Sequence, residues 1–198
     1  MVKKFLVIGL LSMGGMALAM DIKPELNNLS DAVSIEILDL KDIEQTASVF
    51  HNGFLAAYGR FKPEEIGVTG DMESYLREWF IDHCNHVRHC EKPLYCIVAK
   101  HNKAIVGYIV FETLDNQGTI YLYSIAVDPS VHGKGIGTRL ISAISDVVPT
   151  RKIIVHTRNV NSSAIFYKKL GFKDSNIKSP YYQELAHVLI GFELDLAD

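Results

Sequence analysis

The chain has 198 residues, of which 48% are hydrophobic and 22% are charged, and its formal net charge is −3. This balance suits one globular domain with a short extension and disfavours a largely disordered chain. A nucleic-acid partner is disfavoured as well, because the chain has no excess of lysine and arginine.

The N-terminus has the parts of a secretory signal peptide. A basic start precedes an uncharged, mostly apolar run from Phe5 to Ala19, which ends on Ala17-Leu18-Ala19. A signal peptidase reads small residues at this spacing, and the run is short for a membrane span. We therefore expect residues 1–19 to be a signal peptide and the protein to be exported, to the periplasm or outside the cell. The alternatives are an uncleaved anchor, which would be the only membrane contact, and a cytoplasmic protein that starts at Met20.

After this segment the pattern predicts a linker at 20–32 and one domain at 33–198. Strands are predicted at 33–38, 95–100, 104–111, 119–127, 152–157 and 187–194. Helices are predicted after Asp39, from about Asp71, at 136–148 and at 162–170. The order is β-α-α-β-β-β-α-β-α-β-β. The expected fold class is α/β (α+β), with a mixed, mainly antiparallel sheet of six to seven strands and helices on both faces.

Single residues mark the ends of several of these elements. Asp39 is placed to cap the first helix and Gly59 to end it. The short turn at 101–103 predicts a β-hairpin. Pro149 prevents the helix 136–148 from continuing, and Gly171 is the expected C-terminal cap of the next helix.

A glycine-rich loop joins the strand 119–127 to the helix that follows. It reads His132-Gly133-Lys134-Gly135-Ile136-Gly137. The first N–H groups of a helix have no partner within the helix, and the helix dipole is positive at that end, so this junction favours anions. Glycine permits close approach of the backbone to a phosphate, and Lys134 adds a cation. The spacing differs from a Walker A loop and from a Rossmann fingerprint, and a plain glycine-rich turn is the alternative.

Residues 125–137 resemble the acetyl-CoA signature of the GNAT superfamily of N-acetyltransferases. In that signature arginine or glutamine is followed after two residues by glycine, any residue, and glycine or alanine; His132 stands in the first position. The segment 161–172, which ends in Tyr167-Lys168-Lys169-Leu170-Gly171-Phe172, resembles the second signature of the family. The order of elements from Val33 to Leu194 is also similar, so the resemblance covers nearly the whole domain.

The resemblance implies an acyltransferase that moves an acetyl group from acetyl-CoA to a primary amine. The amine would attack directly in a ternary complex, and it would belong to a small molecule, a lysine or a protein N-terminus. Acetyl-CoA is the implied co-substrate, and no metal is expected. The implied cofactor contacts are Ile125, Ala126, Val127, His132, Gly133, Lys134, Gly135, Ile136, Gly137, Thr138 and Asn161.

The resemblance also assigns roles within this set. The N–H of Ile125 or Ala126 would bind the thioester oxygen, and Val127 would pair with the pantetheine arm. Asn161 either contacts the cofactor or caps its helix.

Two residues are the candidates for proton transfer. Tyr167 matches the general acid of the family, which would protonate the departing thiolate; its alternative role is to pack a helix on the sheet. Glu112 ends a strand near the expected cleft and is the candidate general base, with Tyr121, Tyr123, His156 and water as alternatives. By analogy with the family, the segments 59–70 and 174–186 should line the acceptor site.

A separate cluster of histidines and cysteines lies between Asp82 and Cys90. On a continuous helix His83, His86 and Cys90 would share one face, and these are zinc-ligand types. The same face carries Met72, Leu76 and Trp79, so packing in the core is the expectation. A metal or redox site and a disulfide among Cys84, Cys90 and Cys96 are the alternatives.

Several properties stay open at this stage. A catalytically inactive CoA-binding module on the same fold is the alternative to an enzyme. The acceptor, the acyl chain length and the oligomeric state, a homodimer included, are not fixed by the sequence.

Overall fold

A computed structural model of the protein describes residues 32–66, 71, 74, 94–160, 162–181 and 188–196. The predicted signal peptide, most of the helix expected from Asp71, the His/Cys cluster and Asn161 lie outside these ranges. In the described part of the chain, no helix is long and apolar enough to cross a membrane.

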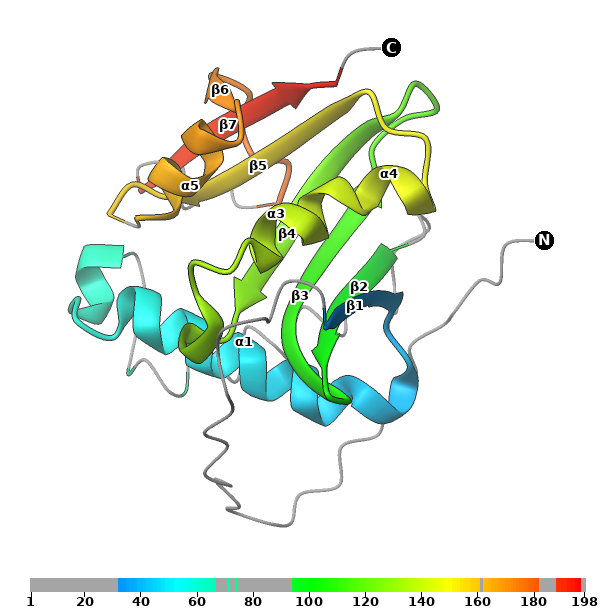
Figure 1. Cartoon of the computed structure of the whole chain (residues 1–198). Helices are drawn as coiled ribbons and strands as arrows, with labels where there is room; N and C mark the ends of the chain where they lie inside the picture. The colour runs from blue at the N-terminus through cyan, green and yellow to red at the C-terminus, as the bar shows by residue number, and fades with distance from the viewer. Residues whose placement is uncertain are drawn as a thin grey trace.

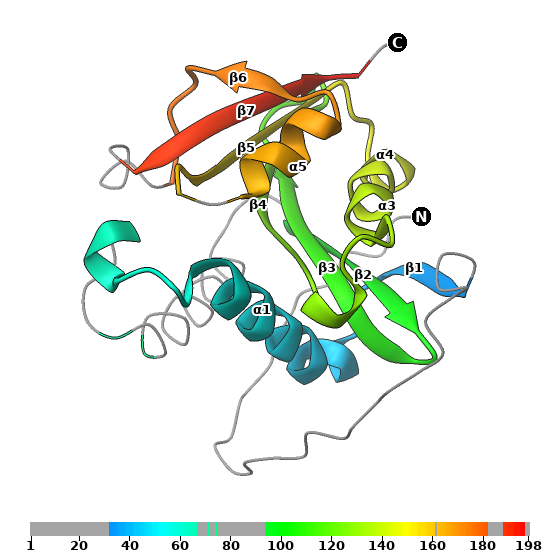
Figure 2. The same ribbon diagram turned by 60° about the vertical axis from the view of Figure 1, so that its left-hand side comes forward.

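One sheet of seven strands forms the middle of the domain (Figures 1 and 2). The strand order is β1-β2-β3-β4-β5-β7-β6. Strands β4 and β5 are parallel, and all other neighbours are antiparallel, so the sheet is mixed and mainly antiparallel as expected. The strands are β1 (Val33–Ile37), β2 (Leu94–His101), β3 (Ala104–Thr113), β4 (Thr119–Val127), β5 (Lys152–Arg158), β6 (Lys173–Ser175) and β7 (Leu189–Asp195).

Helices cover both faces of this sheet. In the view of Figure 1, α3 and α4 lie in front of the sheet and α1 behind it. The helices are α1 (Ile43–Tyr58), α3 (Ile136–Ser142), α4 (Ile144–Val147) and α5 (Ser163–Lys169), with short 3₁₀ turns η2 (Leu40–Asp42), η3 (Pro63–Ile66) and η4 (Pro129–Val131).

Strand alternation assigns side chains to two separate hydrophobic cores. On β4, Ile120 and Leu122 belong to the core that includes α3, α4 and α5. Tyr121 and Tyr123 belong instead to the core under α1, which also holds Ile154 of β5. Successive side chains of a strand point to opposite faces of the sheet. A residue two positions from Tyr121 or Ile154 along its strand therefore faces α1, and a residue next to either of them in the chain faces α3–α5.

Most of the predicted end signals have the expected effect. Helix α1 ends before Gly59, and Gly171 follows α5 with φ of +90°, the left-handed conformation that glycine adopts without strain. Asn102 and Lys103 form the hairpin turn, with φ of 49° and 69°.

Three details differ from the sequence prediction. The carboxylate of Asp39 accepts a hydrogen bond from the N–H of Lys41 (3.2 Å) and so caps the 3₁₀ turn η2, not α1. The helix expected at 136–148 is divided into α3 and α4 at Ala143. Strand β6 has only three residues, too few for a recognisable alternation, and pairs with β7.

A bulge and a divergence in the centre of the sheet shape the site. The β3–β4 register shifts between Val110 and Phe111, because Val110 lies opposite Ser124 and Phe111 opposite Leu122. Tyr123 is therefore the extra residue on β4, and a bulge of this kind bends its strand. The pairing of β4 with β5 runs only from Thr119 to Leu122, and the two strands separate beyond that point.

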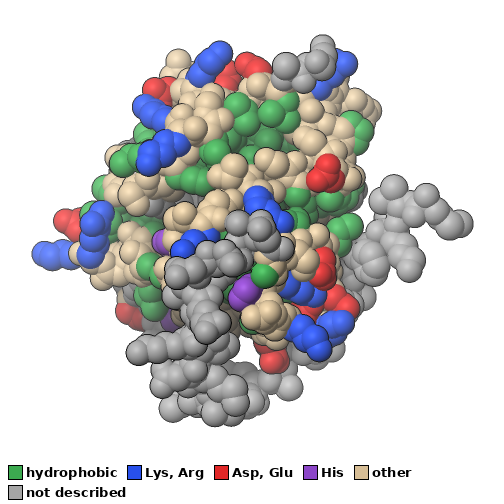
Figure 3. Space-filling model, in the orientation of Figure 1, with side chains coloured by type: hydrophobic (Ala, Val, Ile, Leu, Met, Phe, Trp, Pro, Cys, Tyr) green, Lys and Arg blue, Asp and Glu red, His purple; other side chains and the backbone are tan. Residues whose placement is uncertain are grey.

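Charged side chains are distributed over the surface without separation by sign. Figure 3 shows lysine, arginine, aspartate and glutamate side chains scattered over one face, among apolar and neutral groups. Several exposed side chains form ion pairs, such as Lys168 with Asp174 (3.1 Å) and Lys41 with Asp39 (3.0 Å). Exposed pairs contribute little to stability, so the two cores carry the fold.

Close packing of α1 on β4 gives a test of the fold. A Cβ added at Gly53 would lie 2.9 Å from the Cβ of Ala126. Gly53→Ala should lower the free energy of unfolding, because overpacking costs about 1–3 kcal/mol and outweighs the gain of about 1 kcal/mol in helix propensity. Chemical denaturation of Gly53→Ala, Ala126→Gly and the double variant checks this. The free energy of unfolding of the double variant should be higher than the sum of the two single changes predicts. If the changes add within about 0.5 kcal/mol, residues 53 and 126 are not overpacked against each other.

Candidate functional site

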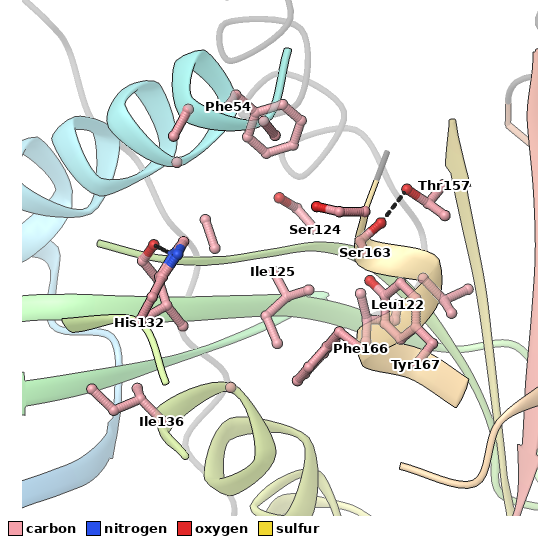
Figure 4. Close-up of a pocket in the computed structure, with 18 of the residues that line it drawn as sticks. Phe54, Leu122, Ser124, Ile125, His132, Ile136, Thr157, Ser163, Phe166 and Tyr167 are labelled. Carbon is pink, nitrogen blue, oxygen red and sulfur yellow. Dashed lines mark hydrogen bonds between the residues drawn. The ribbon is translucent and has the colours of Figure 1, made fainter. Parts of the chain in front are cut away.

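A cavity of about 660 Å³ lies between the separated ends of β4 and β5. Helix α1 closes it on one face of the sheet, and the N-terminus of α3 together with α5 closes it on the other (Figure 4). The lining from β4 and β5 is Leu122, Tyr123, Ser124, Ile125, Ala126, Val127, Val155, His156, Thr157 and Arg158, and β7 adds Leu189. This volume is in the range of small-molecule and cofactor sites.

The backbone of β4 presents alternate residues to this cavity. The N–H of Asp128 bonds to the carbonyl of Val106 (2.9 Å), and Ala126 lies opposite Tyr108 in the same register. In an antiparallel ladder every second residue bonds to its partner strand, so the polar backbone of Ala126 faces β3. The N–H groups of Ile125 and Val127 therefore face the cavity.

The glycine loop opens the cavity at the N-terminus of α3. Gly135 is the N-cap of that helix with φ of 75°, and Gly133 has φ of 76°. A Cβ built on either glycine meets nothing within 4 Å, so their backbone borders open space. Gly137 is different, since its Cβ would lie 3.0 Å from the ring of Phe166 and its role is close packing of α3 on α5. The loop thus combines positive φ, open space and a helix N-terminus, which are the elements of an anion site.

His132 binds the protein itself. Its Nε2 lies 2.8 Å from the carbonyl oxygen of Val127 and donates to it, as the dashed line in Figure 4 shows. The ring thereby fastens the glycine loop to the end of β4. Asp128 supports the same turn, accepting hydrogen bonds from the N–H (2.9 Å) and the hydroxyl (2.6 Å) of Ser130.

Most of the predicted cofactor residues meet at this cavity. Its walls include Ile125, Ala126, Val127, His132, Gly133, Gly135, Ile136, Gly137 and Thr138. Lys134 is exposed and does not line the cavity, and Asn161 lies outside the described residues. Within the described ranges, no three His, Cys, Asp or Glu side chains converge on a metal-sized site.

Tyr167 of α5 lines the cavity and is otherwise buried. Its ring packs against Phe166, Phe172 and Phe192, with centroid distances of 5.3, 5.4 and 5.7 Å. Burial raises the pKa of its hydroxyl above the ordinary value of 10.0, because the phenolate would be poorly solvated there. The phenol is therefore held in its protonated form and can serve as a proton donor.

Glu112 does not line the cavity. It is almost fully buried on β3 and accepts a hydrogen bond from the hydroxyl of Tyr181. The ring of Tyr181 packs on Tyr123, with centroids 4.7 Å apart, and Tyr123 does line the cavity. The rings of Tyr181 and Tyr123 thus stand between Glu112 and the space in which an acceptor would lie.

The α1 side of the cavity carries residues that the sequence did not single out. Phe54 and Tyr58 of α1 line it, together with Arg158 of β5. The Nε of Arg158 donates to the carbonyl of Ile66 (2.6 Å), and its guanidinium lies over the ring of Tyr58. Alternation along β5 could have indicated these positions. Ile154 belongs to the α1 core, and residues 156 and 158 follow it on the same face of the sheet.

The opposite side is closed by a hydroxyl pair at the start of α5. The hydroxyls of Thr157 and Ser163 lie 2.7 Å apart and join the end of β5 to this helix (Figure 4). The pair holds α5, and with it Tyr167, against the strand. No sequence pattern selects either residue, because their contact depends on the path of the chain between β5 and α5.

Comparisons with known proteins agree on one family. Residues 47–172 match the acetyltransferase (GNAT) family. An N-alpha-acetyltransferase of Sulfurisphaera tokodaii is 31% identical over 127 residues, which cover 57% of this chain and 73% of that protein. An L-2,4-diaminobutyric acid acetyltransferase of Marinococcus halophilus is 32% identical over 84 residues, which cover 39% of this chain and 48% of that protein. The chain spans about half or less of the length of the first curated relatives it matches.

The fold has close counterparts among solved structures. The PaiA N-acetyltransferase of Thermoplasma acidophilum, whose crystal structure contains coenzyme A, superimposes with a TM-score of 0.64 at 18% identity. The alignment covers 83% of this chain and 99% of that one. At this identity the likeness concerns the fold.

A matched pair of variants tests the anion site at Gly135. Asparagine and aspartate have nearly the same size and both tolerate positive φ, but only Gly135→Asp places a negative charge at the helix N-terminus. That charge should stabilise α3 by about 0.3–1 kcal/mol yet repel a pyrophosphate. Calorimetric titration with acetyl-CoA should show binding at least about tenfold weaker for Gly135→Asp than for Gly135→Asn, with an equal or higher melting temperature. Equal affinity of the two variants would exclude phosphate binding at this loop.

Proposed function

Because the chain belongs to the acetyltransferase (GNAT) family, we propose that it is an acetyl-CoA-dependent N-acetyltransferase that acts on a primary amine. One observation carries the proposal: a glycine loop with open space beside it and a buried, protonated tyrosine lie on the same cavity. An anion site and a proton donor at the two ends of one cleft are what transfer from a phosphate-bearing thioester requires.

The residues fit an acetyl-CoA molecule that lies along β4. The N–H groups of Gly133–Gly137 would hold the pyrophosphate, since a Cβ on either exposed glycine would enter open space. The N–H of Val127 would pair with the pantetheine arm. The N–H of Ile125 would donate to the thioester oxygen as negative charge develops there; Ala126 is the weaker choice, because its N–H faces β3.

The phenol of Tyr167 would then protonate the departing thiolate. Its raised pKa keeps the hydroxyl protonated at neutral pH. A thiolate is a weaker base than this phenolate, so the transfer is coupled to the return of a proton from the new amide nitrogen to the phenol oxygen. The rings of Phe166 and Phe172 pack against the ring of Tyr167, with centroids 5.3 and 5.4 Å away, and hold it at the cavity wall.

Two acceptor classes follow from the relatives. One is a free diamino acid, as in the L-2,4-diaminobutyric acid acetyltransferase of Marinococcus halophilus. The other is a protein N-terminus, as in the ribosomal protein bS18 alanine N-acetyltransferase of Salmonella typhimurium, which is 35% identical over 65 residues covering 31% of this chain and 44% of that protein. Both present a primary amine next to further polar groups.

The experiment combines binding with turnover. Residues 21–198 are titrated with acetyl-CoA and then assayed for CoA release with L-2,4-diaminobutyrate and with a peptide that begins with alanine. Saturable binding and release that depends on the amine are the expected results. Binding without release for any amine would favour the inactive CoA-binding module instead, and no binding by the folded protein would reject the proposal.

Tyr167→Phe tests the general acid. The variant keeps the aromatic packing but loses the hydroxyl, so kcat should fall by about 10²–10⁴ while the affinity for acetyl-CoA stays the same. The pH dependence has a defined sign: since burial raises the pKa above 10.0, wild-type activity should not decline on the alkaline side below about pH 10 on account of this group. An unchanged kcat in the variant would leave Tyr167 a packing residue.

Glu112→Gln tests the predicted general base. Loss of the charge at constant shape should lower kcat by about 10²–10⁴ if Glu112 removes the proton of the acceptor ammonium. A fall of less than about tenfold would restrict this carboxylate to holding Tyr181 in place. Melting temperatures of both proteins control for a loss of folding.

A further inference from the structure

The side chain of His156 occupies the acceptor side of the cavity. It extends from β5 on the face that α1 covers, two residues before Arg158, and it lines the cavity, as Tyr123 of β4 does. Its Nε2 lies 2.7 Å from the carbonyl oxygen of Ile177. A carbonyl only accepts hydrogen bonds, so Nε2 carries the hydrogen and Nδ1 keeps an unshared electron pair.

That Nδ1 is a buried polar atom without a hydrogen-bond partner. Among the described residues, the other buried side-chain nitrogen without a hydrogen-bond partner is Nδ1 of His101, and His101 does not line the cavity. Buried polar groups are nearly always satisfied, so an unpartnered acceptor on a residue that lines a cleft is a candidate to receive a hydrogen from a ligand in that cleft.

We infer that His156 is the general base that removes a proton from the acceptor ammonium. The inference deepens the proposed function and rests on it. The imidazole is oriented by Ile177 through Nε2, as a catalytic histidine is oriented by its second nitrogen, and it presents Nδ1 as the atom that accepts the proton.

The surroundings keep this ring neutral. Tyr121 of β4 packs beside it, with centroids 5.8 Å apart, Gly191 of β7 lies against its edge, and Arg158 follows on the same face. Burial lowers the pKa of His156 below the ordinary 6.5, and the hydrogen bond to Ile177 opposes this only in part. A lowered pKa means that the ring is neutral, and able to accept a proton, at every pH above that lowered value.

The proton balance of the reaction closes with two residues. Nδ1 of His156 takes one proton from the ammonium, and the free amine forms a C–N bond to the thioester carbon. The C–S bond breaks, and the thiolate takes the proton of the Tyr167 hydroxyl. The new amide nitrogen returns a proton to the phenolate, and the imidazolium releases its proton to solvent. The sum is one amide, one free thiol and one proton.

This role differs from that of Glu112, which does not line the cavity and bonds to Tyr181, whose ring packs on the cavity residue Tyr123. Tyr121 lies between the two groups: its hydroxyl pairs with Ser179 (2.8 Å), and burial raises its pKa to about 12, with the charge of Glu112 a smaller cause. Glu112 is therefore placed to fix the tyrosines that border the acceptor site, while the imidazole meets the acceptor itself.

His156→Gln is the matched variant, because the amide nitrogen of glutamine replaces Nε2 toward Ile177 and removes the basic Nδ1. At pH 7 its kcat should be about 10²–10⁴ lower than that of wild type, with L-2,4-diaminobutyrate or the alanine peptide, whichever is turned over. At pH 10 the acceptor is largely deprotonated before it binds, so the deficit should shrink to less than about tenfold. Glu112→Gln should show no such recovery with pH.

A deficit of His156→Gln that is the same at pH 7 and pH 10 would overturn the role as base, and so would a kcat equal to that of wild type. Absence of turnover in the wild type would instead count against the proposed function. In that case ¹⁵N NMR of the imidazole still decides the geometry: a neutral ring with hydrogen on Nε2 and titration below pH 6.5 is expected, whereas hydrogen on Nδ1 would contradict the inference.

Discussion

The early end of the β4–β5 pairing is the constraint on which the site depends. The two strands are the only parallel neighbours in the sheet that the structure describes, and their pairing stops at Leu122 and Val155. Beyond this pair of residues β5 remains paired with β7, while the bulge at Tyr123 bends β4 away from β5. The cavity forms in the space that a continued pairing would close, and it brings the backbone edge of β4 within reach of a ligand. Backbone polar groups demand partners, so an edge of this kind inside a domain is itself a binding surface.

The two faces of the sheet give the cavity two different chemistries. Toward α3 and α5 lie the glycine loop, at the positive end of a helix, and the phenol of Tyr167 among aromatic rings. Toward α1 lie Phe54 and the imidazole of His156, which has an unsatisfied acceptor atom. The sheet thus separates a side suited to a phosphate-bearing thioester from a side suited to an amine, and the gap between β4 and β5 is where the two can meet.

The sequence predicted features that depend on local patterns. The hydrophobic pattern located six of the strands, glycine at Gly171 marked a helix end, and the glycine-rich loop at 132–137 was expected at the junction where the structure places it, beside the cavity. It did not predict features that depend on how segments meet. Glu112 ends its strand near the cleft but is screened by Tyr181, which is 69 residues away in the chain. The ring of His132 bonds to the carbonyl of Val127, a contact set by the path of the turn between them, and the sequence did not predict this contact. The orphaned Nδ1 of His156 is a property of packing that no sequence pattern expresses.

Amide hydrogen exchange at three consecutive residues of β4 tests the central claim most directly. The N–H groups of Ile125 and Val127 face the gap left by β5, whereas that of Ala126 is directed to β3. NMR-detected exchange is measured with and without acetyl-CoA. The account predicts slower exchange at Ile125 and Val127 when acetyl-CoA is bound, and little change at Ala126. Unchanged exchange at Ile125 and Val127 in the saturated protein would show that the ligand does not lie along β4, and would contradict the account.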